Sequence, residues 1–402
     1  MKRRQFFELL TLGSAAALTV SGRKKTTELL PQKPSPTSAM DPWIEVDLKA
    51  IVANYQRIKK RVGVKVMAVV KANAYGHGLV EVSRSLEKAG VDWLMVGKLD
   101  EAVKLRAAGL RCPVLNFGPL SAGEAAEIVE QGVSQSVSTD EVFRLAEVAA
   151  KKGRQALVHV DIDTGMGRTG IPYDRAPSFI EKIASRDHLR LEGISTTLTE
   201  DLKFDREQLR RLNHVYSQAK KKGINCGLRH AASSAGLLFS ADFYLDMVRP
   251  GITIYGYYPN VKTQQEDSLA LQPALGLKAR VIFIKDLRPG DTLSYHRAFK
   301  TEKEMRAATL GIGYSDGYQP ELGGKSWVII RGKKFKTLPL ITANHLMIDL
   351  ENNREVKCGD EATLISSGKN SAATADLLAA ASGVSSYRLL IGLNPLLPRY
   401  YS

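Results

Sequence analysis

Strand-like and helix-like segments alternate along most of the chain, from Trp43 to about Ala270. Apolar runs such as Val64–Val70 and Gln155–Asp161 are each accompanied by a stretch whose apolar residues have helical spacing. Alternation of this kind over this length favours a closed barrel of eight parallel strands, each followed by a helix, over an open sheet. We therefore expect an α/β chain whose residues 43–275 form an N-terminal (β/α)8 barrel of the TIM type.

The character of the sequence changes after about Gly276. From there the apolar runs are short and strand-like, and turn signals such as Pro289-Gly290-Asp291 separate them. This pattern predicts a second, all-β C-terminal domain over residues 276–402. A chain of 402 residues with 44% apolar residues is long enough to form both domains.

The first 42 residues are typical of a targeting segment rather than of a folded domain. A basic start at residues 2–4 precedes an apolar stretch at residues 9–20, and residues 31–42 form a Pro/Ser-rich linker. This order is that of an export signal, and the pair Arg3-Arg4 resembles a twin-arginine signal. The apolar stretch is too short for a stable membrane span. We expect export to the periplasm or cell envelope, with a cytoplasmic protein as the alternative.

The composition argues against two classes of partner. The net charge of +15 favours anionic ligands, but no basic stripe is interleaved with aromatic residues, so we expect no nucleic-acid partner. The three cysteines, Cys112, Cys226 and Cys358, are far apart in the sequence. Because no Cys/His cluster has the spacing of metal ligands, we expect no bound metal.

A lysine stands at the end of one predicted barrel strand. Lys71 follows the apolar run Val66–Val70 and precedes small residues and two glycines, in the string VVKANAYGHG. The carboxyl ends of barrel strands are where active sites are built, and desolvation there frees a lysine amine for covalent chemistry. A lysine that merely reaches solvent is the alternative, so Lys71 alone does not decide the function.

Three further clusters accompany the lysine in a fixed order. They are DIDTGMGRTG at residues 161–170, HAASSA at residues 230–235 with RPGI at residues 249–252, and GD, LSY and GIGYSDG at residues 290–317. Together they resemble the alanine racemase family, whose members are fold-type III pyridoxal-phosphate enzymes. The resemblance covers residues 43–400. It implies a barrel followed by a β domain, pyridoxal 5′-phosphate as cofactor, a homodimer, and interconversion of L- and D-alanine for cell-wall peptidoglycan.

The resemblance also implies a role for each matching residue. Lys71 would bind the cofactor covalently and act as the base on one face of the amino acid, while Tyr295 would enter the site of the other subunit and act on the opposite face. Arg249 would lie against the pyridine nitrogen of the cofactor. The residues assigned to the cofactor are Lys71, Tyr75, Ser234, Arg249, Gly251, Ile252 and Tyr387, and those near the substrate are Arg168, Tyr314, Ala343 and Asn344.

These residue types suit racemisation. The reaction removes the α proton and returns it to either face, so it needs one base on each face. The cofactor delocalises the charge left on the α carbon. An arginine at the ring nitrogen holds its own proton, so that nitrogen stays unprotonated.

The sequence departs from the family at three places. Asp161 stands where a carbamylated lysine is usual, and as an anion it could orient Arg168. Thr197 stands where a histidine supports the tyrosine base, so the activation of Tyr295 is unexplained, although His230 is kept and could reach Arg249. The pair Ala343-Asn344 replaces Met-Asp at the pocket entry.

The departures leave two alternatives to an alanine racemase. A roomier, less acidic entry favours a racemase of broader specificity that works in the cell envelope. The missing histidine favours a pyridoxal-phosphate-binding homologue with impaired catalysis. A fold-type III decarboxylase is disfavoured, because a carboxylate rather than Arg249 would be expected at the ring nitrogen.

Overall fold

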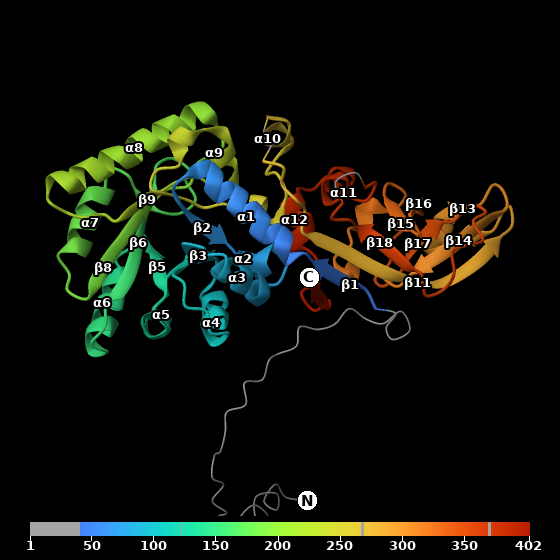
Figure 1. The fold of residues 1–402 in the computed structure, drawn as a ribbon, viewed down its shortest axis with the longest axis horizontal. Coiled ribbons are helices and arrows are strands. Elements are labelled where there is room, and N and C mark those ends of the chain that lie inside the picture. The colour runs from blue at the N-terminus through green and yellow to red at the C-terminus, as the bar shows by residue number, and fades with distance from the viewer. Residues whose placement is uncertain (1–40, 122, 267–268, 369–370) are drawn as a thin grey trace, which may run out of the picture.

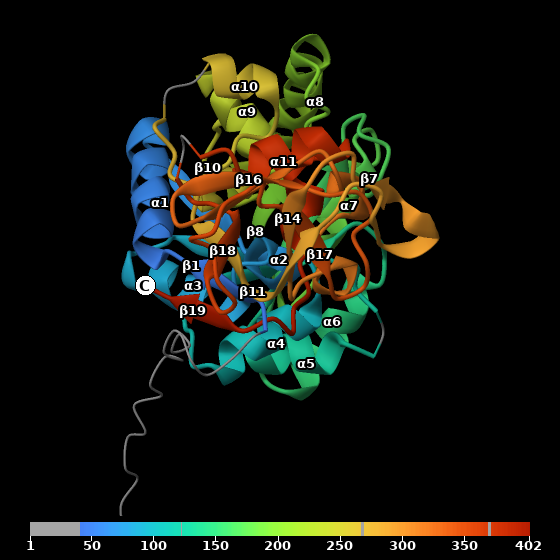
Figure 2. The ribbon, with the colours of Figure 1, turned by 90° about the vertical axis from the view of Figure 1, so that its right-hand side faces the viewer.

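The computed structural model describes residues 41–402 apart from residues 122, 267–268 and 369–370. The described part has two lobes along its long axis, a barrel at the left of Figure 1 and a β domain at the right. Figure 2 looks at the β domain end-on, with the barrel behind it. The predicted export signal and most of its linker, residues 1–40, lie outside the described residues.

Parallel strands close into a ring in the first lobe. Each strand pairs with the next in the order β2, β3, β4, β5, β6, β8, β9 and β10, and β10 returns to β2. This confirms the predicted TIM-type barrel. The strands are β2 (Lys65–Val69), β3 (Trp93–Val96), β4 (Val114–Asn116), β5 (Ser134–Val137), β6 (Ala156–Asp163), β8 (Leu189–Ser195), β9 (Leu228–His230) and β10 (Met247–Val248), with the short β7 (Ile171–Pro172) beside β6.

Helices cover the outside of this ring. The first of them illustrates how the sequence sets their ends, because Asp47 accepts a hydrogen bond from Ala50 N at 2.9 Å at its start and Gly63 has φ 67° at its end. The buried face between these caps packs on the barrel. The helices are α1 (Leu48–Val62), α3 (Leu79–Lys88), α4 (Leu99–Ala107), α5 (Ala125–Gln131), α6 (Val142–Lys151), α7 (Ala176–Ala184), α8 (Leu202–Lys221), α9 (Ser234–Phe239) and α10 (Val261–Glu266).

The second lobe is built on a largely antiparallel sheet, as the sequence predicted. Its order is β14-β17-β16-β15-β18-β11-β1-β19, and β11 also pairs with β14, which curls the sheet on itself. Two short helices, α11 (Ala375–Ser382) and α12 (Ser386–Ile391), return the chain to the barrel. The strands are β1 (Trp43–Val46), β11 (Leu275–Leu287), β14 (Met305–Leu310), β15 (Trp327–Ile330), β16 (Lys333–Thr337), β17 (Leu346–Asp349), β18 (Glu361–Ile365) and β19 (Arg399–Tyr401).

The first strand belongs to a different sheet from the one that its sequence position suggested. Residues from 43 onward were predicted to belong to the barrel, whereas β1 pairs antiparallel with β11, placing Ile44 opposite Leu277, and parallel with β19. A four-residue apolar run indicates burial but does not indicate which sheet the strand joins. As a result, the start and the end of the described chain lie side by side between the two lobes.

No helix in residues 41–402, outside the gaps named above, is long and apolar enough to span a membrane.

Candidate active site

The carboxyl ends of the barrel strands surround a pocket of about 120 Å³. Its walls come from the carboxyl ends of β2, β3 and β4, from the segments that follow β6, β8, β9 and β10, and from helix α12. At this end of a barrel, side chains that follow several different strands can lie close together. The predicted site residues that line it are Lys71, Tyr75, Arg168, Thr197, Ser234, Arg249, Gly251 and Tyr387.

Lys71 reaches the pocket from the end of β2. The residue is exposed overall and lines the pocket. Partial burial lowers the pKa of Lys71, and the Arg168 guanidinium lowers it further, while Glu101 opposes the shift. A lowered pKa raises the share of neutral amine at a given pH, which is the nucleophilic form.

A left-handed turn follows Lys71. Ala72, Asn73, Ala74 and Tyr75 have φ between 52° and 55°, a conformation that costs an L-amino acid roughly 1–2 kcal/mol. Local hydrogen bonds hold the turn, since Asn73 Oδ1 accepts from Leu79 N at 2.9 Å and Ala74 N donates to Val70 O at 2.8 Å. The turn places Lys71 and Tyr75 on the same pocket although they are four residues apart. Nothing in the sequence analysis predicted this geometry.

Two buried side chains, His77 and Arg399, form hydrogen bonds with backbone carbonyls of this turn. His77 Nδ1 lies 3.1 Å from Ala74 O and 3.0 Å from Tyr75 O, so this nitrogen must carry the proton. Burial lowers the pKa of His77 to about 4, which keeps the ring neutral. Arg399 on β19 donates to Gly76 O at 2.9 Å and thereby ties the second lobe to the turn.

Hydrogen-bond donors gather beside Tyr75 in a form that suits a phosphate. Gly251 N donates to Ser234 Oγ at 2.9 Å, and Gly251 precedes the 3-10 turn η2 (Ile252–Tyr255). The Tyr387 ring lies 5.8 Å from the Tyr75 ring. Two phenols, one hydroxyl and a backbone amide are donors that a phosphate dianion can share. A Cβ at Gly251 would lie 2.6 Å from Tyr75 Oη, so the space between them is available only with glycine.

The Ile252 side chain is fully buried in the hydrophobic core, and Ile252 is not among the residues that line the pocket. Any contact that Ile252 makes with a ligand is therefore through its backbone.

Arg249 enters the pocket floor from β10 and is almost fully buried. Its Nη1 donates to His230 Nδ1 at 2.6 Å and to His230 O at 2.9 Å, and its Nη2 donates to Thr196 O at 2.8 Å and Ala231 O at 3.2 Å. Burial lowers the pKa of Arg249 to about 10, with Asp161 opposing the shift. The guanidinium therefore remains protonated at neutral pH and can act at the pocket as a donor that keeps its proton.

Asp161 lies below this floor and has contacts other than the expected one. Its carboxylate accepts hydrogen bonds from Ser195 Oγ at 3.2 Å and Thr169 Oγ1 at 3.1 Å. Burial raises the pKa of Asp161, and the charge of Arg249 opposes this more strongly than that of Arg168. The charge of Arg249 therefore affects the Asp161 carboxylate more than the charge of Arg168 does.

Thr197 occupies the wall where the resemblance expects a histidine. Its side chain lines the pocket, and its carbonyl accepts a hydrogen bond from Gln208 Nε2 at 2.9 Å. Gln208 also donates to Thr164 Oγ1 at 3.1 Å. This wall therefore presents a small side chain held by a buried amide, with no imidazole among the pocket-lining residues.

Of the predicted residues after residue 275, Tyr387 on α12 lines this pocket, whereas the other four lie apart from it. Tyr295, on the turn η3 (Tyr295–Arg297), is 72% exposed, and Tyr314, on η4 (Tyr314–Asp316), is 53% exposed. Asn344 Nδ2 donates to Ser315 Oγ at 3.0 Å, and Ser315 N donates to Ala343 O at 3.0 Å, so Tyr314, Ala343 and Asn344 form one group on the β domain. Within one chain, none of these four lines the pocket at Lys71.

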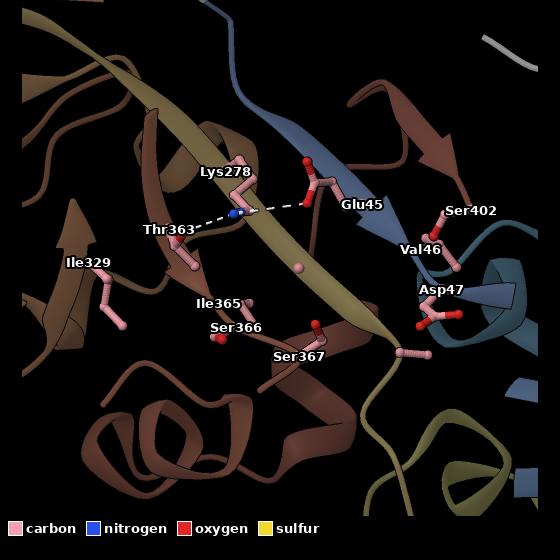
Figure 3. Close-up of a pocket in the computed structure, with 12 residues that line it drawn as sticks. Glu45, Val46, Asp47, Lys278, Ile329, Thr363, Ile365, Ser366, Ser367 and Ser402 are labelled. Carbon is pink, nitrogen blue, oxygen red and sulfur yellow. Dashed lines mark hydrogen bonds and ion pairs between the residues drawn. The ribbon is translucent and has the colours of Figure 1, made fainter. Parts of the chain in front are cut away.

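A second pocket, of about 270 Å³, lies outside the barrel between β1, β11 and β18. Figure 3 shows Lys278 between Thr363 and Glu45. Its Nζ donates to Glu361 Oε1 at 2.8 Å and to Thr363 Oγ1 at 2.9 Å, and lies 3.9 Å from Glu45. None of the predicted site residues is among those that line it. Nor does any group of three or more His, Cys, Asp or Glu in the described chain have the geometry of a metal site.

Comparison with known proteins identifies the family of the chain. Residues 46–259 match the family model "Alanine racemase, N-terminal domain", and residues 274–401 match "Alanine racemase, C-terminal domain". The chain is 37% identical over 366 residues to alanine racemase 2 of Caldanaerobacter subterraneus subsp. tengcongensis, covering 89% of this chain and 94% of the relative. It is 35% identical over 368 residues to alanine racemase 1 of Clostridium acetobutylicum, covering 89% and 95%.

Solved structures give the same result. The alanine racemase of Bacillus anthracis with bound L-Ala-P superposes with a TM-score of 0.84 at 32% identity, covering 91% of this chain and 96% of that one. The alanine racemase of a D-cycloserine-producing Streptomyces lavendulae superposes with a TM-score of 0.86 at 28% identity, covering 91% and 98%. With both domain models matched and relatives above 30% identity over nine-tenths of its length, the chain belongs to the alanine racemase family.

Proposed function

We propose that the chain is a pyridoxal-phosphate-dependent racemase that interconverts L- and D-alanine. One observation carries this conclusion. A lysine with a lowered pKa, a buried arginine and a cradle of phosphate donors meet in a single pocket at the barrel mouth. When the cofactor binds, Lys71 would hold its aldehyde carbon, Arg249 would lie at its ring nitrogen, and its phosphate would be held by Tyr75, Ser234, Gly251 and Tyr387.

The residues of the chain divide the work of racemisation between them. The cofactor, when bound, delocalises the negative charge that develops on the α carbon. Lys71 Nζ, with its lowered pKa, accepts or returns the α proton on one face. Arg249 keeps its guanidinium proton because its four Nη hydrogens are fixed by protein acceptors. Arg168, at the pocket rim, supplies a cation for the substrate carboxylate.

The second base is Tyr295, supplied by a second copy of the chain in a homodimer. Support comes from its placement, since it is 72% exposed on a turn between β12 (Thr292–Leu293) and β13 (Phe299–Lys300) and stands apart from the pocket of its own chain. An aromatic residue so exposed is available to enter a partner's barrel mouth. The group of Tyr314, Ala343 and Asn344 lies on the same lobe and would line the entry of that site.

The decisive experiment is a chiral assay of purified protein loaded with pyridoxal phosphate. L-alanine should yield D-alanine until the two are equal, and Lys71→Ala should abolish both turnover and the cofactor absorption at about 420 nm. Cofactor binding without any D-alanine would overturn the proposed activity and support the impaired homologue that Thr197 favours.

The pair Ala343-Asn344 favours a second candidate, a racemase of broader specificity. Chiral chromatography over a panel of L-amino acids separates the two candidates. Turnover of serine or basic residues comparable to that of alanine would establish the broader enzyme, and Ala343→Met with Asn344→Asp should then narrow the range towards alanine. If the native chain turns over alanine alone, the presence of Ala343-Asn344 in place of Met-Asp does not affect substrate choice.

The setting of the activity is proposed from the sequence. A twin-arginine signal would export the folded, cofactor-loaded enzyme to the periplasm, where D-alanine would serve peptidoglycan. Cell fractionation of the native chain beside an Arg3→Lys, Arg4→Lys variant tests this, because only the native chain should appear outside the cytoplasm. A cytoplasmic native chain would end the export proposal and leave the activity unaffected.

A further inference from the structure

Behind Arg249 lies a buried histidine to which no role has yet been given. His159, on β6, has Nδ1 at 2.9 Å from Nε2 of His230, and both rings are fully buried. His230 in turn has Nδ1 at 2.6 Å from Arg249 Nη1. The three side chains form an unbranched line from the pocket floor into the barrel interior.

Arg249 determines which ring nitrogens of His230 and His159 carry a proton. Arginine has donors only, so Nη1 of Arg249 must donate to His230 Nδ1, and that nitrogen must be unprotonated. A neutral His230 then carries its proton on Nε2 and donates it to His159 Nδ1. Burial and the neighbouring Arg249 charge lower the pKa of both histidines, to about 3 for His159, so both rings are neutral at neutral pH.

The protein makes a specific place for the His159 ring. A Cβ at Gly193 would lie 2.4 Å from His159 Nδ1, so a side chain at that position would displace the ring. On another side the Trp93 ring packs at 5.1 Å and 77°. His159 Nε2 has no hydrogen-bond partner among the described residues, an arrangement that is unfavourable for a purely structural core residue.

We propose that His159 is a positioning residue that fixes the tautomer of His230 and, through it, the direction of the Arg249 guanidinium. All four Nη hydrogens of Arg249 have acceptors in the protein, and its Nε–H has none recorded in the described chain. Holding both Nη groups in place leaves Nε–H as the donor for a ligand in the pocket. The effect on the cofactor rests on the proposed function, whereas the proton order between the histidines does not.

The pair His159→Asn and His159→Leu tests this with side chains of nearly equal shape. Asparagine can place Oδ1 near the position of Nδ1 and accept from His230, whereas leucine cannot. Trp93→Phe is the matched control, since it loosens packing against the same ring without removing the acceptor. The measurements are nitrogen chemical shifts of histidine-labelled holoprotein and the rate at which pyridoxal phosphate is released.

The native protein should show His230 with Nδ1 unprotonated and Nε2 protonated. His159→Leu should lose that pattern and release the cofactor about tenfold faster, which corresponds to one lost hydrogen bond, while His159→Asn and Trp93→Phe should stay near the native rate. A native His230 protonated on Nδ1 would overturn the proposal even if His159→Leu failed to fold. Equal release rates for the Asn and Leu variants would overturn it too. Failure of the proposed function would appear separately, as absence of racemisation by the native protein.

Discussion

The backbone at Gly251 passes so close to Tyr75 that a Cβ atom on residue 251 would lie 2.6 Å from Tyr75 Oη. Gly251 has φ −113°, outside the positive-φ region that favours glycine, whereas the close approach to Tyr75 leaves no room for a side chain. The close approach brings the Gly251 amide, the Ser234 hydroxyl and the Tyr75 phenol onto one small volume. The phosphate site therefore depends on a missing side chain as much as on those present.

Gly251→Ala should weaken cofactor retention because the added methyl group must push the Tyr75 phenol out of the cradle. Loss of one phosphate hydrogen bond predicts release of pyridoxal phosphate about tenfold faster. The rate is measured by trapping the released cofactor and following absorbance. Gly276→Ala is the matched control, since its Cβ would meet its nearest neighbour at 3.6 Å, an ordinary contact. A native release rate in Gly251→Ala would show that Tyr75 does not hold the phosphate.

Mixed dimers should reveal whether Tyr295 acts across a subunit interface. Lys71→Ala and Tyr295→Phe chains with different affinity tags should each be inactive alone. A dimer containing one of each has one site with both defects and one with neither, so it should show about half the native turnover. If purified mixed dimers have no activity, Tyr295 acts in its own chain or not at all, and the proposed exchange of residues between subunits is wrong.

Restoring an imidazole at the pocket wall should speed the reaction. A tyrosine hydroxyl holds its proton at neutral pH without assistance, and Thr197 offers only a hydroxyl. Thr197→His should raise kcat/KM by about a hundredfold, at the lower end of what general acid–base assistance supplies. The pH profile of kcat/KM checks that the gain comes from proton transfer.

If Thr197→His does not raise kcat/KM, either the Thr197 hydroxyl already assists Tyr295 or Tyr295 needs no assistance from this wall. The Thr197→Val variant distinguishes these two explanations. It keeps the shape of threonine and removes the hydroxyl. If Thr197→Val lowers kcat/KM and Thr197→His does not raise it, the hydroxyl itself assists the reaction. Native rates in both variants would show that Tyr295 needs no support from this wall.

The barrel could be predicted because the alternation of segments is a property of the whole sequence, and Lys71 could be found because its position at a strand end has a meaning in that fold. The left-handed turn could not, because Ala72 and Ala74 carry no local preference for positive φ. Contacts distant in sequence, such as Arg399 with Gly76, select that conformation. Backbone propensities depend only on residues that are neighbours in the sequence, so they do not include such contacts.

His159 was missed for a different reason. A lone histidine inside an apolar strand is usually a core residue that satisfies one hydrogen bond, and the sequence does not show what lies across the barrel. Its signal was nevertheless present, since His159 and Asp161 stand two residues apart and therefore face the same side of β6. Polar residues repeated on the inner side of a barrel strand indicate a buried network.

Buried neutral histidines should make the fold sensitive to mild acid. Burial lowers the pKa of His77 to about 4 and that of His159 to about 3, from 6.5 in the unfolded chain. A base with a lowered pKa in the folded state contributes stability that is fully present above pH 6.5. That stability is lost as pH falls from 6.5 towards the folded pKa, because the unfolded chain takes up the proton first.

The free energy of unfolding should therefore fall by about 1.4 kcal/mol per pH unit for each of these histidines below pH 6. Urea unfolding at about pH 7.5, 6.0 and 5.0 measures the slope. His77→Asn keeps a donor for the carbonyls of Ala74 and Tyr75 but cannot be protonated, so its slope should be shallower by about that amount. His345→Asn, at an exposed position, should leave the slope unchanged. Parallel slopes for the native chain and His77→Asn would mean that His77 is not held neutral by burial.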